Sequence, residues 1–173
     1  MVLLTLMAAI TIGIVRLRNL FAVVVLGGIY SFLMASVLIV LDAVDVAMTE
    51  ASVGAGISTV LMLGTLYLTT DQEAVPAHTP LLPLFVSAVT GVALVYGTID
   101  LPAFGLADTP MHTHVGGSYL TSSVPETGIP NVVTSVLASY RGYDTLGETT
   151  VIFTAGIGVL LLLSRALRPA GNK

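Results

Sequence analysis

Residues 19–41 contain no charged side chain. As an α-helix, a run of this length is about 34 Å long, which is enough to cross a hydrocarbon core of about 30 Å. The rest of the chain follows the same trend, since 55% of its residues are hydrophobic, 9% are charged and the mean hydropathy is +0.97. An ordinary soluble domain has about 25% charged residues. The sequence therefore predicts an all-α integral membrane protein.

Four further apolar segments are expected to cross the membrane, which gives about five spans in total. They cover residues 1–15, 46–68, 81–99 and 149–164. The first would be only about 22 Å long as a helix, so we interpret it as a short span matched to protein neighbours. An apolar stripe over 131–140 is too short to cross and predicts a surface or re-entrant helix. Residues 100–130, rich in Gly, Pro, Thr, Ser and His, predict a polar loop.

The basic residues predict the orientation. With five spans, the loop after the first span and the tail after the fifth lie on the same side of the membrane. Together they hold five of the six basic residues, namely Arg16, Arg18, Arg165, Arg168 and Lys173. Because cytoplasmic loops carry an excess of Lys and Arg, we expect a multi-pass protein of the inner (cytoplasmic) membrane with a cytoplasmic C-terminus.

Several classes of function find no support. The chain has no cysteine, which excludes a disulfide framework and thiolate metal sites. No basic patch indicates nucleic acid, and no nucleophile elbow, phosphate loop or dinucleotide fingerprint is present. His78, His112 and His114 stand in polar segments without an acid or cysteine that completes a metal site. We therefore expect no enzyme activity, no cofactor and no metal.

Glu50 is the most informative charged residue, because it lies about one turn inside the third span. A carboxylate in hydrocarbon costs a few kcal/mol, so such residues usually face protein or water and often mark an ion or proton route. A simpler alternative places Glu50 at the headgroup level, where the helix dipole favours an acid. Asp42 and Asp45 precede it and either cap the third helix or form an acidic mouth that concentrates cations.

Small residues follow Glu50 at three- to four-residue spacing and favour close helix packing. They are matched in the second span by Gly27, Gly28 and Ser31. Plain helix packing is the default interpretation of this pattern. Because Gly54 and Gly56 also weaken the helical hydrogen-bond ladder, a π-bulge near Gly54 to Ile57 is a further hypothesis.

A second charged cluster precedes the last span and consists of Arg141, Asp144 and Glu148. Thr145 stands three residues before Glu148, which is the spacing of a capping box. The same acids could instead pair with Arg141 or dock against another subunit. Both interpretations remain open at this point.

Two stretches resemble known membrane modules. Residues 42–63, DAVDVAMTEASVGAGISTVLML, resemble the signature helix of the MbhD-like domain, and residues 131–159, NVVTSVLASYRGYDTLGETTVIFTAGIGV, resemble the MbhE-like and MnhB-like pattern. These modules occur in Mrp-type multisubunit Na+/H+ antiporters and in membrane-bound hydrogenases. They are similar to the J subunit of respiratory complex I, a five-helix protein whose third helix carries a π-bulge.

The resemblance implies a non-enzymatic subunit of a Mrp-type monovalent cation (Na+)/proton antiporter. Its partners would be other subunits of the complex, Na+ and H+, and the lipid bilayer. Glu50 matches the intramembrane carboxylate of the family, and Asp144 and Glu148 match its second acidic motif. We expect an MbhD-like module over 1–99 and an MbhE/MnhB-like module over 131–173. The alternatives are a hydrogenase-like or complex I-like redox-driven ion pump and a non-conducting scaffold subunit.

Overall fold

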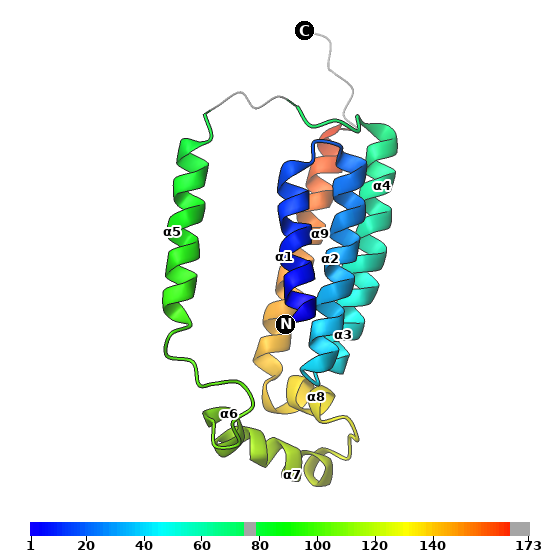
Figure 1. The fold of residues 1–173 in the computed structure, drawn as a ribbon. Coiled ribbons are helices and arrows are strands. Elements are labelled where there is room, and N and C mark those ends of the chain that lie inside the picture. Colours follow the sequence, from blue (N-terminus) through cyan, green and yellow to red (C-terminus); the bar gives the residue numbers. More distant parts are fainter. Residues whose placement is uncertain (75–78, 167–173) are drawn as a thin grey trace. The chain divides into compact units, whose positions relative to one another are not determined.

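The computed structural model describes residues 1–74 and 79–166, which fold mainly into helices (Figure 1). The chain divides into two compact units, Met1–Val86 and Ser87–Lys173. The first unit contains α1 (Val2–Arg16), α2 (Leu20–Val40), α3 (Val44–Thr49), the π-helix η1 (Glu50–Ile57) and α4 (Ser58–Leu68). The helix α5 (Leu81–Gly97) follows, and the boundary between the units falls within it.

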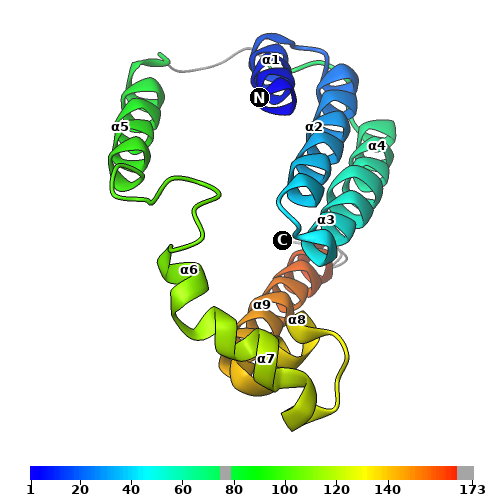
Figure 2. The same cartoon turned by 60° about the horizontal axis from the view of Figure 1, so that its bottom comes forward.

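Helices α3, η1 and α4 form one continuous helix, because Glu50 and Ser58 at its two junctions keep right-handed helical dihedral angles. Helix α2 packs against this long helix on one side and against α1 on the other (Figures 1 and 2). The buried apolar residues of the described chain are few, namely Met7, Val24, Ala35 and Ala47. Most large apolar side chains face outward, as expected for helices whose surroundings are lipid or other subunits.

Backbone hydrogen bonds tie together one end of this unit. The Asn19 side chain accepts from the Ala22 N–H at 2.9 Å and so caps α2. The Leu20 N–H donates to the Asp71 carbonyl at 2.7 Å, and the Glu73 N–H donates to the Arg18 carbonyl at 3.0 Å. The segment after α4 therefore lies beside the connection between α1 and α2.

At the other end of the unit, α2 turns into α3 through a left-handed residue. Asp42 has φ 59°, a conformation that Asp tolerates better than most residues. The Ala43 N–H donates to the Leu38 carbonyl at 2.9 Å, and the Asp42 N–H donates to the Ile39 carbonyl at 3.0 Å. This is the Schellman pattern of a helix C-terminus, so the second and third predicted spans are antiparallel neighbours.

The second unit contains α6 (Pro110–Thr113), α7 (Val115–Thr127), α8 (Val132–Ser135), the π-helix η2 (Val136–Tyr140) and α9 (Gly142–Ala166). Where we expect a polar loop over 100–130, the structure therefore places two helices. Pro110 stands in the first turn of α6, where its missing N–H has no cost. Gly128 closes α7 with φ 71°, a left-handed C-cap. These turn-forming residues mark helix ends within the segment.

The short helix expected over 131–140 is present as α8 and η2, and Asn131 caps it by accepting from the Thr134 N–H at 2.9 Å. It packs on α7, where Ser123 and Ser135 are fully buried. Helix α9 begins at Gly142, earlier than the predicted start at 149. The polar residues before 149 therefore belong to the same helix as the apolar run after them.

Three helices are long and apolar enough to cross a membrane: Leu20–Val40, Val44–Leu68 and Gly142–Ser164. The apolar helices Val2–Arg16 and Leu81–Gly97 are present but shorter. The five apolar segments are thus all helical, while the count of five spans stays a prediction. Arg168 and Lys173, which support the predicted orientation, lie outside the described residues.

Candidate functional site

Glu50 is half-buried and is the first residue of η1. Within η1 the helix is wound with five-residue hydrogen bonds, and the Ser58 N–H donates to the Val53 carbonyl at its end. The predicted π-bulge near Gly54 to Ile57 is therefore confirmed, and it reaches back to Glu50. Because π-winding adds a residue to the turn, it changes the direction in which the flanking side chains project.

The space beside Gly54 holds the Glu50 carboxylate. A Cβ atom built on Gly54 would lie 2.6 Å from Glu50 Oε1 and 2.8 Å from Ser31 Oγ. The Glu50 side chain therefore folds along its own helix, and the Ser31 hydroxyl reaches the same space from α2. The close approach of two helices predicted from the small residues is confirmed here for α2 and η1. The Glu50 carboxylate and the Ser31 hydroxyl both lie in the space that a Gly54 side chain would occupy.

Gly28 on α2 likewise leaves space that a side chain of the neighbouring helix fills. A Cβ atom built on Gly28 would lie 2.7 Å from Thr59 Oγ1 and 3.7 Å from the Ala55 carbonyl oxygen. The Thr59 hydroxyl is buried and has no hydrogen-bond partner among the described residues. Gly56 differs, since it is exposed and only the Ala51 carbonyl oxygen of its own helix lies near, at 3.6 Å.

The two aspartates before Glu50 are exposed. Asp45 lies in the first turn of α3, and the N-cap position is Ala43. The expectation that Asp45 caps this helix is therefore wrong, although an acid in the first turn still interacts favourably with the helix dipole. Asp42 forms the left-handed turn before α3. Glu50 follows Asp45 by five residues, a rise of about 7.5 Å along the helix.

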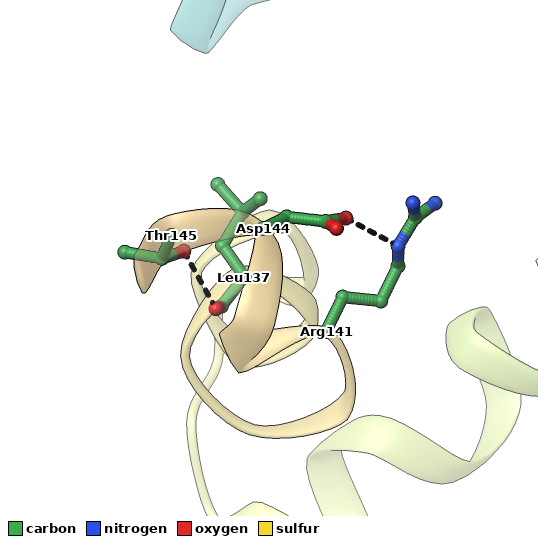
Figure 3. A network of polar contacts seen from close by, with 4 residues as sticks. All are labelled: Leu137, Arg141, Asp144 and Thr145. Atoms are coloured by element: carbon green, nitrogen blue, oxygen red, sulfur yellow. Dashed lines mark hydrogen bonds and ion pairs between the residues drawn. The ribbon is translucent and has the colours of Figure 1, made fainter. Parts of the chain in front are cut away.

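The second charged cluster lies at the start of α9, and Figure 3 shows two of its members, Arg141 and Asp144. Arg141 Nε and Asp144 Oδ2 are 2.6 Å apart, with the side chains 59% and 46% exposed. A pair this exposed adds about 1 kcal/mol or less to stability. Glu148 is also exposed and follows Asp144 by one helical turn. The internal pairing considered for Arg141 is therefore present.

Thr145 does not form the capping box that its spacing suggests. It is inside α9, which starts at Gly142, and its hydroxyl donates to the Leu137 carbonyl at 2.8 Å (Figure 3). The capping interpretation fails because the helix begins before Thr145 instead of after it. Thr145 joins α9 to η2, and this contact holds the turn that carries Arg141.

One contact of the second unit was not expected from the sequence. The Tyr140 hydroxyl donates to the Glu126 carboxylate, and the rings of Tyr119 and Tyr140 are 5.2 Å apart at 47°. The hydrogen bond to Glu126 raises the pKa of the Tyr140 phenol, since its ionisation would place a second negative charge beside the carboxylate. The contact joins α7 to η2. The sequence did not predict it, because a loop was expected over 100–130.

Comparisons with known proteins agree with the two-module arrangement. Residues 5–71 match the family model MbhD, which describes the D subunit of MBH, and residues 84–173 match the model MbhE, which describes its E subunit. The second match begins within α5 and includes α6 and α7.

Two relatives match nearly the whole chain. The A subunit of the Na(+)/H(+) antiporter of Alkalihalophilus pseudofirmus is 27% identical over 164 residues, which are 94% of this chain and 20% of the relative. A protein of Rhizobium meliloti described as a probable A/B subunit of a K(+)/H(+) antiporter is 27% identical over 161 residues, 91% of this chain and 16% of the relative. The chain thus spans about a fifth or less of the length of the curated relatives it matches. Because the MbhE model covers more than half of the chain, the chain belongs to the MbhE family, and an MbhD module precedes the MbhE module in it.

Proposed function

We propose that the chain is a non-enzymatic subunit of a multisubunit monovalent cation (Na+)/proton antiporter, and that Glu50 lies on its ion or proton path. The observation that carries the proposal is the position of the Glu50 carboxylate. It lies inside a helix long and apolar enough to cross a membrane, and it occupies the gap at Gly54 together with the Ser31 hydroxyl. The similarity to antiporter subunits supports the same function.

The proposed role of Glu50 follows from the cost of a charge in the membrane. A carboxylate there is retained where binding and releasing a cation or proton is useful, since otherwise an apolar residue would be more stable. The exposed Asp42 and Asp45 precede it at the turn between α2 and α3. Their negative charges would raise the local concentration of cations at one entrance to Glu50.

Arg141, Asp144 and Glu148 serve a separate purpose in this proposal. They are exposed at the start of α9, and we assign them to docking against other subunits of the complex. The proposed setting is the inner membrane with a cytoplasmic C-terminus, in agreement with the distribution of Arg16 and Arg18.

The test compares Glu50→Gln with the wild type in the complete assembly. Na+-driven proton exchange is measured in inverted membrane vesicles, and assembly is measured on a native gel. We expect Glu50→Gln to abolish exchange while the complex assembles normally, because the amide is similar in size but cannot take up or release a proton at neutral pH. Glu73→Gln is the matched control, since Glu73 is exposed outside the helices. Unchanged exchange with Glu50→Gln would refute the role of Glu50.

A further inference from the structure

The proposed function leaves one half of the path to Glu50 undefined. Asp42 and Asp45 stand at the turn between α2 and α3, on one side of Glu50 along the helix. On the other side the helix continues through η1 and α4 to the end that is hydrogen-bonded to the connection between α1 and α2. Any path through Glu50 needs polar groups on that side as well.

The Thr59 hydroxyl is the polar group that distinguishes this side. Thr59 lies nine residues beyond Glu50, about 13 Å further along the helix, and its hydroxyl points at Gly28 of α2. Threonines in helices usually donate to the carbonyl four residues earlier, as Thr11 does to Met7 and Thr65 does to Leu61. Thr59 does not, and its buried hydroxyl has no partner among the described residues.

A buried hydroxyl without a partner is costly, and ordered water is the usual remedy. The Thr59 side chain fills the space beside Gly28, and the Ala55 carbonyl oxygen lies 3.7 Å from the same Cβ position. A hydroxyl and a carbonyl oxygen, which are the partners that an ordered water uses, therefore lie at the same place in the helix contact. Towards Glu50, Ser31 adds a hydroxyl from α2 at the gap of Gly54. The two gaps follow one another along the contact between α2 and η1–α4.

We propose that Ser31 and Thr59 form a polar seam between α2 and η1–α4, through which water reaches Glu50 from the α4 end. The seam rests on the proposed function and deepens it, because it supplies the second side of the path. A proton moves along it by ordinary transfer between oxygens: each hydroxyl accepts one proton as it releases its own, and Glu50 gains or loses the net proton. Ser31 is a positioning residue that holds the Glu50 carboxylate in the gap at Gly54.

The first test measures hydration without transport. The chain has no cysteine, so single-cysteine variants can be labelled with a small methanethiosulfonate reagent in membranes that contain the complete assembly. Thr59→Cys and Ser31→Cys are compared with Val60→Cys and Ala35→Cys. Val60 is 69% exposed on the outer face of α4, and Ala35 is buried on α2 at 3%. Since the reagent attacks the thiolate, which forms only where water is present, labelling reports the hydration of each position.

We expect Thr59→Cys and Ser31→Cys to be labelled several-fold faster than both controls. Labelling no faster than the controls would overturn the seam. This result does not depend on exchange, so it is independent of the outcome with Glu50→Gln.

The second test keeps the shape of Thr59 and removes its hydroxyl. Thr59→Val should slow Na+-driven proton exchange several-fold in the assembled complex, while Thr59→Ser, which keeps the hydroxyl, should restore it. Ser31→Ala should shift the pH profile of exchange, since it changes the surroundings of the Glu50 carboxylate. If Glu50→Gln abolishes exchange while Thr59→Val leaves it normal, the seam is wrong and the proposed function stands. If Glu50→Gln leaves exchange normal, the proposed function fails, whatever the labelling shows.

Discussion

At Gly54, the absence of a Cβ atom leaves the space that the Glu50 and Ser31 side chains share. Gly54→Ala should retain the helix, since alanine is favoured over glycine there by up to about 1 kcal/mol. The new Cβ atom would lie 2.6 Å from Glu50 Oε1 and 2.8 Å from Ser31 Oγ, so the carboxylate has to move. We therefore expect a large loss of exchange in vesicles with no loss of complex on a native gel.

Gly56→Ala is the matched control for this prediction. A Cβ atom at Gly56 meets only the Ala51 carbonyl oxygen at 3.6 Å, which is an ordinary contact. The two variants have the same chemistry and nearly the same position in η1. Equal losses of exchange would show that helix flexibility at both glycines matters more than the position of the carboxylate.

Residues differ in how far the sequence alone could assign them. The sequence alone singles out Glu50, because an acid in an apolar run is rare and costly, and its role stays a prediction. The sequence does not single out Thr59, because the hydroxyl of a threonine in a helix usually donates to a carbonyl of its own helix. Only the structure shows that the Thr59 hydroxyl lies buried against Gly28 of α2 without such a hydrogen bond. Asp45 is not the cap that its position in the sequence suggests, because the helix already starts at Val44, with Ala43 at the N-cap.

The elements also differ in how well the sequence predicts them, as η1 and α7 show. The paired glycines allow the hypothesis of a π-bulge near Gly54 to Ile57, and the structure contains a π-helix there that extends over Glu50–Ile57. Helix α7 was hidden by its composition, since Gly, Ser and Pro favour turns. Contacts between residues distant in sequence hold it in place. One of them is the hydrogen bond from Tyr140 to Glu126, which are fourteen positions apart. Such pairs cannot be identified from local patterns.

The contact between α7 and η2 should depend on alkaline pH. The pKa of Tyr140 is raised above the ordinary tyrosine value of about 10. The stabilisation from its neutral hydroxyl is therefore fully present below that value and is lost as the pH rises through the raised pKa. In an ultraviolet titration of tyrosinate, we expect an ionisation step above the ordinary tyrosine value, and this late step should be missing in Tyr140→Phe.

Glu126→Gln separates the cause of this shift from burial. The amide can accept the hydrogen bond but carries no charge, so Tyr140 should then titrate closer to the ordinary value. Tyr119→Phe keeps the ring beside Tyr140 and removes only the smaller charge effect of Tyr119, so it should lower the pKa of Tyr140 less than Glu126→Gln does. A late step that survives Glu126→Gln would contradict the assignment to the carboxylate.

For the whole molecule, hydropathy predicted the five apolar helices, because their runs contain few charges. It does not predict what covers the apolar faces of these helices. The described residues bury only four apolar side chains: Met7, Val24, Ala35 and Ala47. The long apolar helices expose most of their surface. We expect the exposed faces to contact lipid or other subunits, and no pattern within one chain can specify those contacts.

The charged cluster at the start of α9, Arg141, Asp144 and Glu148, should affect assembly of the complex more than the stability of the chain. Because Arg141 and Asp144 are exposed, their pair adds little to the stability of the chain itself. If the cluster docks against another subunit, the charges become desolvated in the assembly, and truncating one partner of such a pair costs about 2–5 kcal/mol. The double variant Arg141→Gln with Glu148→Gln should therefore lower the amount of intact complex on a native gel.

Exchange in this double variant should fall in proportion to the remaining complex, because the ion path itself is unchanged. Glu50→Gln should behave in the opposite way, with the complex retained and exchange lost. Asp71→Asn with Glu73→Gln is the matched control, since both residues are exposed outside the helices. Full assembly of the double variant would contradict docking through Arg141 and Glu148. We would then expect the chain to join other subunits through the exposed apolar faces of its helices, because most of their large side chains are exposed.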